Sequence, residues 1–377
     1  MKILFLGGTG RLSKDVAALA TDRGNEVYLL TRGTAQRASF VDERYHMLTG
    51  DIRNKELALS VLQDYSFDVV VDFLTFNVEQ LRNTLDILRG KFRQYIFIST
   101  ATVYRRENYD ELISEDRTPI GNDKWQYAYN KYLCEVEIKK WFFGKKENYT
   151  IIRPGVTYSN TRIPYPIVPA DTQKEYSFLY RVKINAPIPV FDYGDTEVTI
   201  TNSKDFAKGV IGLMGNKLGY GEAFHITSSE KVTWGMVLDS LERICGVKIN
   251  RLFVSQSDIY KEDPYYKDVL IGDKGNKTRY DNSKIISVVP DLSFDVLLED
   301  GLKETVKFYE NHPEHQIIDY HWMGIMDRIA IKKHSKVVKF AITGTVNRLS
   351  YLKGRYRIIG LLLKTMRKVK NLLINRK

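Results

Sequence analysis

A glycine-rich bend near the amino terminus constrains the fold of this chain more than any other feature. Gly7-Gly8-Thr9-Gly10 directly follows the apolar run of residues 3–6, and a helical pattern begins at Leu12. Gly7 permits a tight turn, and Gly10 lets the backbone approach a pyrophosphate at the amino terminus of the helix. The bend therefore predicts a dinucleotide site. Ser13 replaces the third glycine of the usual fingerprint, and we expect it to loosen the packing of helix on strand slightly.

Short apolar runs alternate with helical patterns through the first half of the chain. Strands that are apolar throughout are typical of a parallel sheet covered on both faces, and we expect them at residues 3–6, 26–30, 69–72 and 95–98. We expect the helices between them at residues 12–23, 55–64, 78–88 and 128–142. This order predicts an α/β fold, with a Rossmann-type doubly wound parallel sheet in a first domain of residues 1–158.

The chain changes character after about residue 159, where loops and prolines become frequent. Its 377 residues exceed one average domain, and helical patterns return at residues 205–213 and 234–245. We therefore predict a smaller C-terminal substrate domain over residues 159–330, part of which, near 199–215, returns to the first domain. A cleft between the two domains would hold the substrate.

The positive charge of the chain is concentrated in its last segment. The net charge is +11, but residues 331–377 contain 14 Lys and Arg and no Asp or Glu, which leaves 43 basic against 46 acidic residues before them. Apolar groups such as Val337-Val338, Ile358-Ile359 and Leu361-Leu362-Leu363 alternate with these cations, which predicts a basic amphipathic helical tail. Such a tail suits peripheral contact with an anionic membrane. A solvated extension, or a docking segment for another protein, is the alternative.

Several classes of protein are disfavoured by the sequence. The main body is nearly neutral, so we expect no specific nucleic acid as a partner. Cys134 and Cys245 lie far apart without metal or redox spacing, which indicates a reducing cytosol and no metal site. No apolar stretch approaches the roughly 20 residues of a membrane-spanning helix. We expect a cytoplasmic protein, or one held at the inner face of the membrane by its tail.

The end of the second predicted strand bears on the choice of cofactor. Dinucleotide folds that prefer NAD usually place a carboxylate there, whereas this chain has Arg32, and Arg11 adds a second guanidinium. These charges favour the 2′-phosphate of NADP. The alternative is that Arg32 is a solvated turn residue or stacks on adenine. Asp51 either accepts a hydrogen bond from adenine or caps the helix that follows it.

Three further motifs follow the glycine bend along the chain. They are Thr100-Ala101-Thr102-Val103-Tyr104, then Tyr127-Ala128-Tyr129-Asn130-Lys131 with Glu135, then Arg153-Pro154. In this order, and covering roughly residues 1–330 with the bend, they resemble the motifs of the extended short-chain dehydrogenases, the NAD-dependent epimerase/dehydratase family. The resemblance implies hydride transfer on a sugar or nucleotide sugar, a role in surface polysaccharide synthesis, NAD or NADP as cofactor, and a homodimer.

Tyr127 and Lys131 carry the chemistry that we predict. Residues four apart lie on one face of a helix, so the Lys131 ammonium can sit near the Tyr127 hydroxyl and lower its pKa from about 10. Tyr127 can then take the proton of a substrate hydroxyl while hydride leaves the same carbon, and Thr100 would hydrogen-bond that oxygen. Tyr129 is a decoy, because Leu133 stands four residues on.

The resemblance assigns the remaining contacts residue by residue. In the family the lysine also anchors the nicotinamide ribose. The predicted cofactor-binding residues are Gly7, Thr9, Gly10, Arg11, Leu12, Arg32, Asp51, Ile52, Leu74, Ser99, Tyr127, Lys131 and Pro154. The predicted catalytic residues are Thr100, Tyr127 and Lys131, and the predicted substrate-binding residues are Thr100, Thr102, Tyr127 and Val156.

Departures from the family's pattern narrow the reaction. Sugar dehydratases of the family have Asp and Glu directly after the catalytic Thr, where this chain has Ala101 and Thr102. Without that pair, elimination of water is disfavoured, which leaves epimerisation or reduction. Val156 replaces an Asn that is common in nucleotide-sugar enzymes, and this puts a standard nucleotide sugar in doubt. We expect His225 to be a packed core residue.

A non-catalytic protein of the same fold is the rival hypothesis. The strand end Thr31-Arg32-Gly33 resembles that of some nucleic-acid-associated relatives. The presence of Thr100, Tyr127 and Lys131 disfavours this hypothesis, because a protein that only binds its ligand does not need these three catalytic residues.

Overall fold

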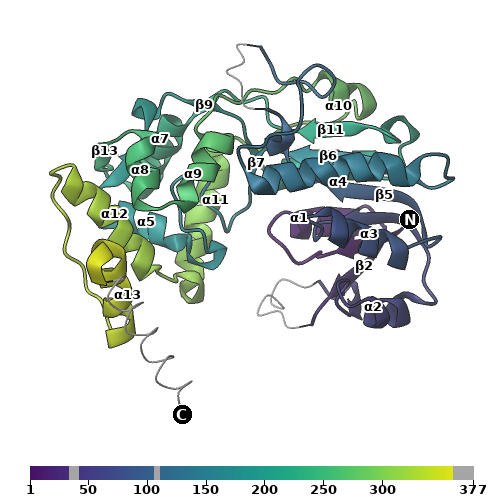
Figure 1. Cartoon of the computed structure of the whole chain (residues 1–377), viewed down its shortest axis with the longest axis horizontal. Helices are drawn as coiled ribbons and strands as arrows, with labels where there is room; N and C mark the ends of the chain where they lie inside the picture. Colours follow the sequence, from purple (N-terminus) through teal and green to yellow (C-terminus); the bar gives the residue numbers. More distant parts are fainter. Residues whose placement is uncertain (34–41, 106–110, 360–377) are drawn as a thin grey trace, which may run out of the picture. The chain divides into compact units, whose positions relative to one another are not determined.

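The computed structural model describes residues 1–33, 42–105 and 111–359, which form two compact units (Figure 1). The first unit contains Met1–Ser159, Glu197–Val232 and Ile271–Gly301. The second contains Asn160–Thr196, Thr233–Leu270 and residues 302–359. The sequence pattern predicts a return to the first unit only near residues 199–215. In the structure Ile271–Gly301 also belongs to the first unit.

The first unit is built on a seven-stranded sheet with the order β11-β6-β5-β4-β1-β2-β3. All its neighbouring strands run parallel, which confirms the predicted Rossmann-type doubly wound fold. Its strands are β1 (Lys2–Leu6), β2 (Glu26–Thr31), β3 (His46–Thr49), β4 (Phe67–Asp72), β5 (Phe92–Ile98), β6 (Asn148–Pro154) and β11 (Ala223–Ile226).

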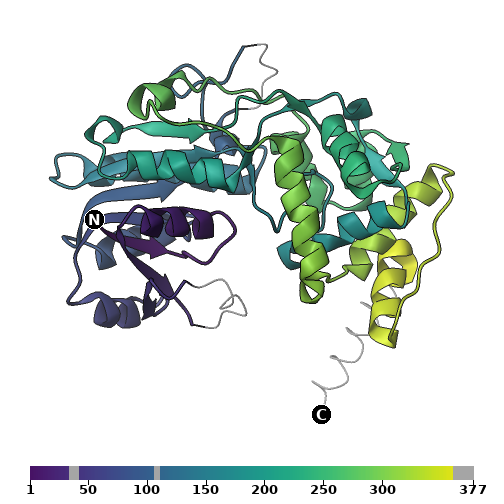
Figure 2. The same ribbon diagram turned by 180° about the vertical axis from the view of Figure 1, so that it is seen from behind.

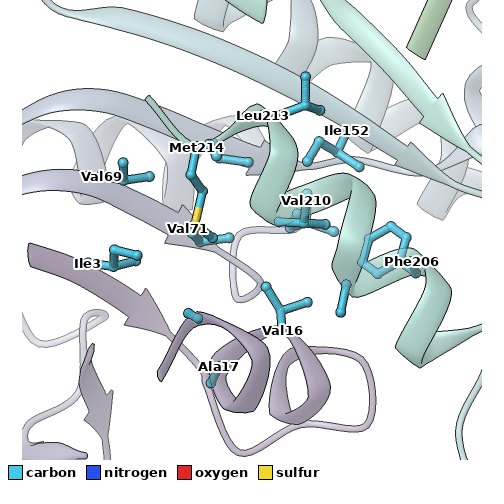
Figure 3. Close-up of a cluster of buried hydrophobic side chains, with 14 of the residues drawn as sticks. Ile3, Val16, Ala17, Val69, Val71, Ile152, Phe206, Val210, Leu213 and Met214 are labelled. Carbon is cyan, nitrogen blue, oxygen red and sulfur yellow. The ribbon is translucent and has the colours of Figure 1, made fainter. Parts of the chain in front are cut away.

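Helices cover both faces of this sheet (Figures 1 and 2). One face packs against α1 (Ser13–Asp22) and α6 (Ser203–Leu213), where Val16 and Ala17 meet Phe206 and Val210 over the strands (Figure 3). The other face packs against α2 (Lys55–Leu62), α3 (Val78–Ile87) and α4 (Gln126–Phe142). This burial of two apolar faces explains why the central strands are apolar throughout.

Shorter elements complete the first unit. The strands β7 (Val156–Tyr158) and β10 (Ile200–Asn202) form a parallel pair. The remaining elements that begin in this unit are η2 (Ala101–Val103), β9 (Glu197–Val198), η5 (Lys217–Gly219), β12 (Val232–Thr233), α10 (Ser283–Val288) and α11 (Leu298–Asn311).

The second unit is mainly helical. Its strands β8 (Ile188–Val190) and β13 (Arg251–Phe253) form a parallel pair. Its helices are η3 (Thr172–Lys174), α5 (Tyr176–Lys183), η4 (Asp192–Gly194), α7 (Trp234–Cys245), α8 (Gln256–Glu262), α9 (Tyr265–Val269), η6 (Leu270–Lys274), η7 (Pro313–His315), α12 (Tyr320–Lys332) and α13 (Thr345–Arg355). None of the helices in the described ranges is long and apolar enough to cross a bilayer.

The predicted basic tail is only partly helical where it is described. Val337 and Val338 lie in a stretch without helix between α12 and α13, and Leu361 to Leu363 lie outside the described residues. α13 packs on α12 along a seam of two glycines, Gly324 and Gly354. A Cβ atom on either one would overlap backbone atoms of the opposite helix.

A buried ion pair holds the same helices to α5. Arg181 of α5 donates to Asp327 of α12 at 2.8 Å, and neither side chain is more than 1% exposed. Tyr351 of α13 donates its hydroxyl to the other oxygen of Asp327 at 2.6 Å. The described part of the basic segment therefore belongs to the packed second unit.

The glycine seam can be tested by adding one methyl group. Alanine at position 354 would favour the helix by about 1 kcal/mol, but the new methyl would force the two backbones apart at a larger cost, about 1–3 kcal/mol. We expect Gly354→Ala to lower the free energy of unfolding, measured by urea denaturation. Thr345→Ala, at an exposed position of the same helix, is the control. Equal stability of the two variants would contradict the seam.

Candidate functional site

The glycine bend joins β1 to α1 and is closed by Ser13. The Ser13 hydroxyl donates to the Gly7 carbonyl at 2.6 Å and accepts from the Gly10 N–H at 2.8 Å. This hydroxyl makes two hydrogen bonds inside the bend that a glycine could not make, whereas the expected looser packing of helix on strand stays a prediction. A side chain on Gly8 would overlap Leu29 of β2, so the bend lies directly on the sheet.

Leu74 is brought to the glycine bend from the end of β4. A Cβ atom on Gly7 would come within 2.7 Å of the Leu74 Cδ2 atom, and Gly7 has a φ of +86°. Thr9, Arg11 and Leu12 lie in the bend with half-buried side chains. The structure thus places these predicted cofactor-binding residues together.

The ends of β2 and β3 hold the next predicted contacts. Arg32 is exposed and directly follows β2. Asp51 accepts from the N–H of Arg53 at 3.0 Å. The cap of α2 is Asn54, not Asp51, because the Asn54 side chain accepts from the N–H of Leu57. Ile52 is buried beside this turn.

Helix α4 presents Tyr127, Lys131 and Glu135 at four-residue spacing. The Lys131 ammonium is 2% exposed and donates to the carbonyls of Thr75 at 2.6 Å and Ile98 at 2.7 Å. The Phe76 ring lies 4.8 Å from the Lys131 Nζ atom and 6.3 Å from the half-buried Tyr127 ring. Burial lowers the pKa of Lys131 to about 8. Lys131 is therefore fixed one helical turn from Tyr127, whereas Tyr129 faces outward.

Thr100 caps the amino terminus of the short helix η2 and stands two residues after the end of β5. Its Oγ1 atom accepts from the Thr102 N–H at 3.2 Å and lies 3.0 Å from the Thr102 hydroxyl oxygen. Both threonines are buried, at 6% and 7% exposure. Pro154 ends β6, and Val156 begins β7 with a half-buried side chain. Thr100, Thr102 and Val156 thus follow the carboxyl ends of the neighbouring strands β5 and β6, whereas Tyr127, the fourth predicted substrate residue, comes from α4.

A buried ion pair fastens α4 to the sheet. Arg153 of β6 donates to both oxygens of Glu135, at 3.1 and 2.7 Å, and both side chains are nearly inaccessible. The Ser99 hydroxyl donates to Glu135 at 2.6 Å, so the Ser99 side chain helps to hold α4. Contact of the Ser99 backbone with a cofactor stays a prediction. Glu135 and Arg153 belong to the sequence motifs, but the sequence alone predicts no role for either residue.

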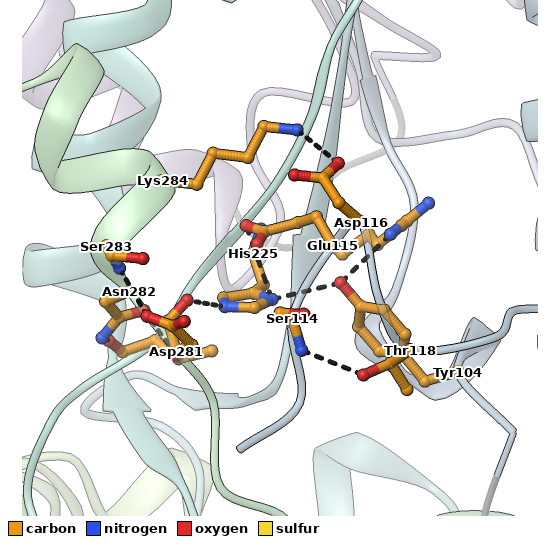
Figure 4. Close-up of polar contacts among 12 residues, drawn as sticks. Tyr104, Ser114, Glu115, Asp116, Thr118, His225, Asp281, Asn282, Ser283 and Lys284 are labelled. Carbon is orange, nitrogen blue, oxygen red and sulfur yellow. Dashed lines mark hydrogen bonds and ion pairs between the residues drawn. The ribbon is translucent and has the colours of Figure 1, made fainter. Parts of the chain in front are cut away.

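The same network continues to a buried histidine (Figure 4). Arg153 donates to the Tyr104 hydroxyl at 3.0 Å, and Tyr104 is hydrogen-bonded to His225 Nδ1 at 3.1 Å. His225 Nε2 lies 2.7 Å from the Asp281 carbonyl. Burial lowers the pKa of His225 to about 4, so the ring is neutral. His225 is a packed core residue, as its sequence context indicated.

Glu115 is a second acidic member of this network, after Glu135, and was missed by the sequence analysis. Its side chain is 3% exposed and accepts from the His225 backbone N–H at 2.9 Å. Burial raises the pKa of Glu115 to about 7. Among the described residues, no group of three or more His, Cys, Asp and Glu is placed to hold a metal ion.

The raised pKa of Glu115 predicts a pH-dependent contribution to stability. Between the ordinary value of 4.5 and about 7, the folded state holds a proton that the unfolded state releases. The stabilisation is complete below pH 4.5 and is lost as the pH rises through 7. The free energy of unfolding of wild type relative to Glu115→Gln should therefore fall by roughly 1–3 kcal/mol from pH 5 to pH 8. Asp116→Asn, at the exposed neighbouring carboxylate, is the control; an equal trend in both variants would contradict the assignment.

Comparison with known proteins places the chain in a family. The model of the NAD dependent epimerase/dehydratase family matches residues 3–226. An Arabidopsis thaliana protein described as chloroplast stem-loop binding protein of 41 kDa b is 27% identical over 256 residues, which is 65% of this chain and 62% of that relative, less than two thirds of its length.

Solved structures share the fold. UDP-glucuronic acid 4-epimerase from Bacillus cereus, in complex with NAD, has a TM-score of 0.66 at 20% identity, covering 84% of this chain and 98% of that one. dTDP-glucose 4,6-dehydratase from Bacillus anthracis, also with NAD, has a TM-score of 0.66 at 17% identity, covering 83% and 98%. Because the family model matches more than half of its residues, this chain belongs to the NAD-dependent epimerase/dehydratase family.

Proposed function

We propose that the chain is an NAD(P)-dependent enzyme that transfers hydride at a sugar or nucleotide-sugar carbon, as an epimerase or a reductase. The observation that carries this proposal is the Lys131 ammonium, buried and held by two carbonyls one helical turn from Tyr127. A buried ammonium needs compensation for its lost hydration, and two strong acceptors supply only part of it. A helix with only a structural role would not need a buried ammonium at this position.

The residues of the first unit fit a dinucleotide. Contacts with Leu74 and Leu29 leave no room for side chains at Gly7 and Gly8, so glycine is needed there for the bend to pack on the sheet. The bend leads into the amino terminus of α1, where free backbone N–H groups suit a pyrophosphate. Bound nicotinamide would accept or supply the hydride. Two of the three Lys131 N–H donors are used by carbonyls, and we assign the third to the nicotinamide ribose.

Tyr127 moves the proton in this proposal. The Lys131 charge favours the phenolate of Tyr127, which takes the proton of the substrate hydroxyl as hydride leaves the same carbon. In the reverse direction the Tyr127 hydroxyl returns that proton to the substrate oxygen. Thr100, fixed by η2, holds the oxygen in place through its own hydroxyl, and Thr102 lies beside it.

The type of reaction follows from what stands next to Thr100. Ala101 and Thr102 offer no carboxylate for the elimination of water, so we propose an epimerase or a reductase rather than a dehydratase. Arg32 and Arg11 favour NADP, and exchangeable NADPH would favour reduction. Mass spectrometry of the cofactor released from purified protein separates the two: tightly held NAD indicates an epimerase, whereas an empty site that prefers NADPH indicates a reductase.

Partners and location form the rest of the proposal. We infer a cytoplasmic homodimer that acts in surface polysaccharide synthesis, on the strength of the family resemblance, with residues 331–377 in contact with an anionic membrane. Support for the membrane contact comes from α13 and the chain after it, where Val346 is 81% exposed and Ile358 is 69% exposed amid Arg348, Lys353 and Arg357. Exposed aliphatic side chains among cations suit lipid headgroups and acyl chains together.

Nucleic-acid binding without catalysis is the second candidate. It is favoured by the stem-loop binding protein that matches 65% of this chain. This candidate requires that RNA binding persist when the basic residues of the tail are neutralised, and that purified protein bind neither NAD nor NADPH. Cofactor binding together with loss of RNA binding on neutralisation would exclude it.

Replacing Tyr127 tests the enzyme directly. We expect Tyr127→Phe to reduce turnover by about 10²–10⁴-fold, because the group that moves the proton is removed. Turnover is followed as oxidation of reduced cofactor with a panel of keto sugars for a reductase, and as interconversion of sugar epimers for an epimerase. Cofactor affinity, followed by nicotinamide fluorescence, should fall far less than turnover, because Tyr127 is one of many predicted cofactor contacts. Tyr129→Phe, two residues away on the exposed side of α4, is the matched control and should leave turnover unchanged. Equal effects of the two substitutions would contradict the proposal.

Liposome flotation tests the membrane contact. Val346→Glu together with Ile358→Glu should reduce flotation of the full chain with anionic vesicles, because both exposed apolar contacts become charged. Leu218→Glu, at a 69% exposed apolar residue of the first unit, is the control and should not change flotation. Undiminished flotation of the double variant, or no flotation of the wild type, would remove the membrane from the proposal.

A further inference from the structure

Asp72, the last residue of β4, is a fully buried carboxylate to which neither the sequence pattern nor the family resemblance gave a role. It has no exposed surface. One oxygen accepts from the N–H groups of Leu74 at 2.7 Å and Thr75 at 3.0 Å. The other accepts from the Thr75 hydroxyl at 2.6 Å and from the Tyr95 hydroxyl. Four donors on one buried carboxylate fix the turn that follows β4.

This turn contacts both halves of the proposed site. Leu74 lies against Gly7 of the glycine bend. Thr75, the next residue, offers its carbonyl to the Lys131 ammonium at 2.6 Å. The carboxylate of Asp72 therefore sets the position of the wall of the glycine bend and of one of the two acceptors that hold Lys131.

Asp72 also acts on Lys131 through its negative charge. The acidic groups that act on the ammonium are Asp72, Cys134 and Glu135. Glu135 is paired with Arg153 at 2.7 Å. Burial raises the pKa of Cys134 to about 12, so its thiol is neutral. The charge of Asp72 thus opposes the effect of burial on Lys131.

We propose that Asp72 is a positioning residue of the site, which holds the turn that binds Lys131 and keeps the Lys131 ammonium charged. The inference rests on the proposed function, because Lys131 acts on Tyr127 only in its charged form. Asp72 touches neither substrate nor cofactor in this role. It acts through the Thr75 carbonyl and through its charge.

The test is the titration of Lys131 in the full-length protein. Lysine labelled with ¹³C at Cε reports protonation by NMR, and Lys131→Arg identifies the signal. We expect a wild-type midpoint near pH 8. In Asp72→Asn the midpoint should fall by about one pH unit, because a neighbouring opposite charge is lost. The upper pH limit of kcat/KM should move to lower pH by the same amount, an effect that a merely structural role would not produce.

Tyr95→Phe provides a second variant in case Asp72→Asn does not fold. The substitution removes the Tyr95 hydroxyl, which donates to Asp72, but keeps the negative charge of the Asp72 carboxylate. Without the hydroxyl dipole, that charge acts more strongly on Lys131. The Lys131 midpoint should therefore rise in Tyr95→Phe. An unchanged midpoint in Asp72→Asn, or an unchanged or lower midpoint in Tyr95→Phe, would overturn the inference. The titration needs neither substrate nor cofactor, so shifted midpoints in a protein without activity would contradict the proposed function alone.

Discussion

The ion pair between Glu135 and Arg153 is the constraint on which the candidate site depends. Both groups are nearly inaccessible, and such a pair is tolerated only when each charge is fully bonded. Arg153 uses three donors, on two carboxylate oxygens and the Tyr104 hydroxyl, and Ser99 adds a fourth bond to the cluster. Because Glu135 is fixed, the inward face of α4 is fixed, and Lys131 and Tyr127 occupy that face at intervals of four residues.

Much of the first unit was predictable because local rules dominate there. The glycine bend, the central strands and α1 to α4 follow from apolar runs and helical spacing, with boundaries that differ by a few residues. The strands β3, β6 and β11 were missed for physical reasons. β3 is an edge strand with one buried residue in four, β6 has half-buried polar and aromatic residues at its start, and β11 is only four residues long and includes His225.

The polar interior of the site was not predictable from one sequence. Tyr104 and His225 are 121 positions apart, and Asp72 and Tyr95 are 23 apart, yet each pair is in hydrogen-bonding contact. No spacing rule connects residues on different strands. The signal available for Asp72 was an acid that follows three valines at the end of β4, a position that parallel sheets direct toward ligands. Ser13 shows the converse, since a small residue that was expected to weaken packing supplies bonds of its own.

The glycine seam between α12 and α13 gives the C-terminal helix a mechanical role. With no side chains between Gly324 and Gly354, the two helices cannot roll on each other without losing contacts along both. Tyr351, bonded to the aspartate that pairs with Arg181, extends this stiffness to α5. A surface that binds α13 therefore also restrains α5 and α12. Binding at α13 would thus anchor the second unit and make it more rigid at the same time.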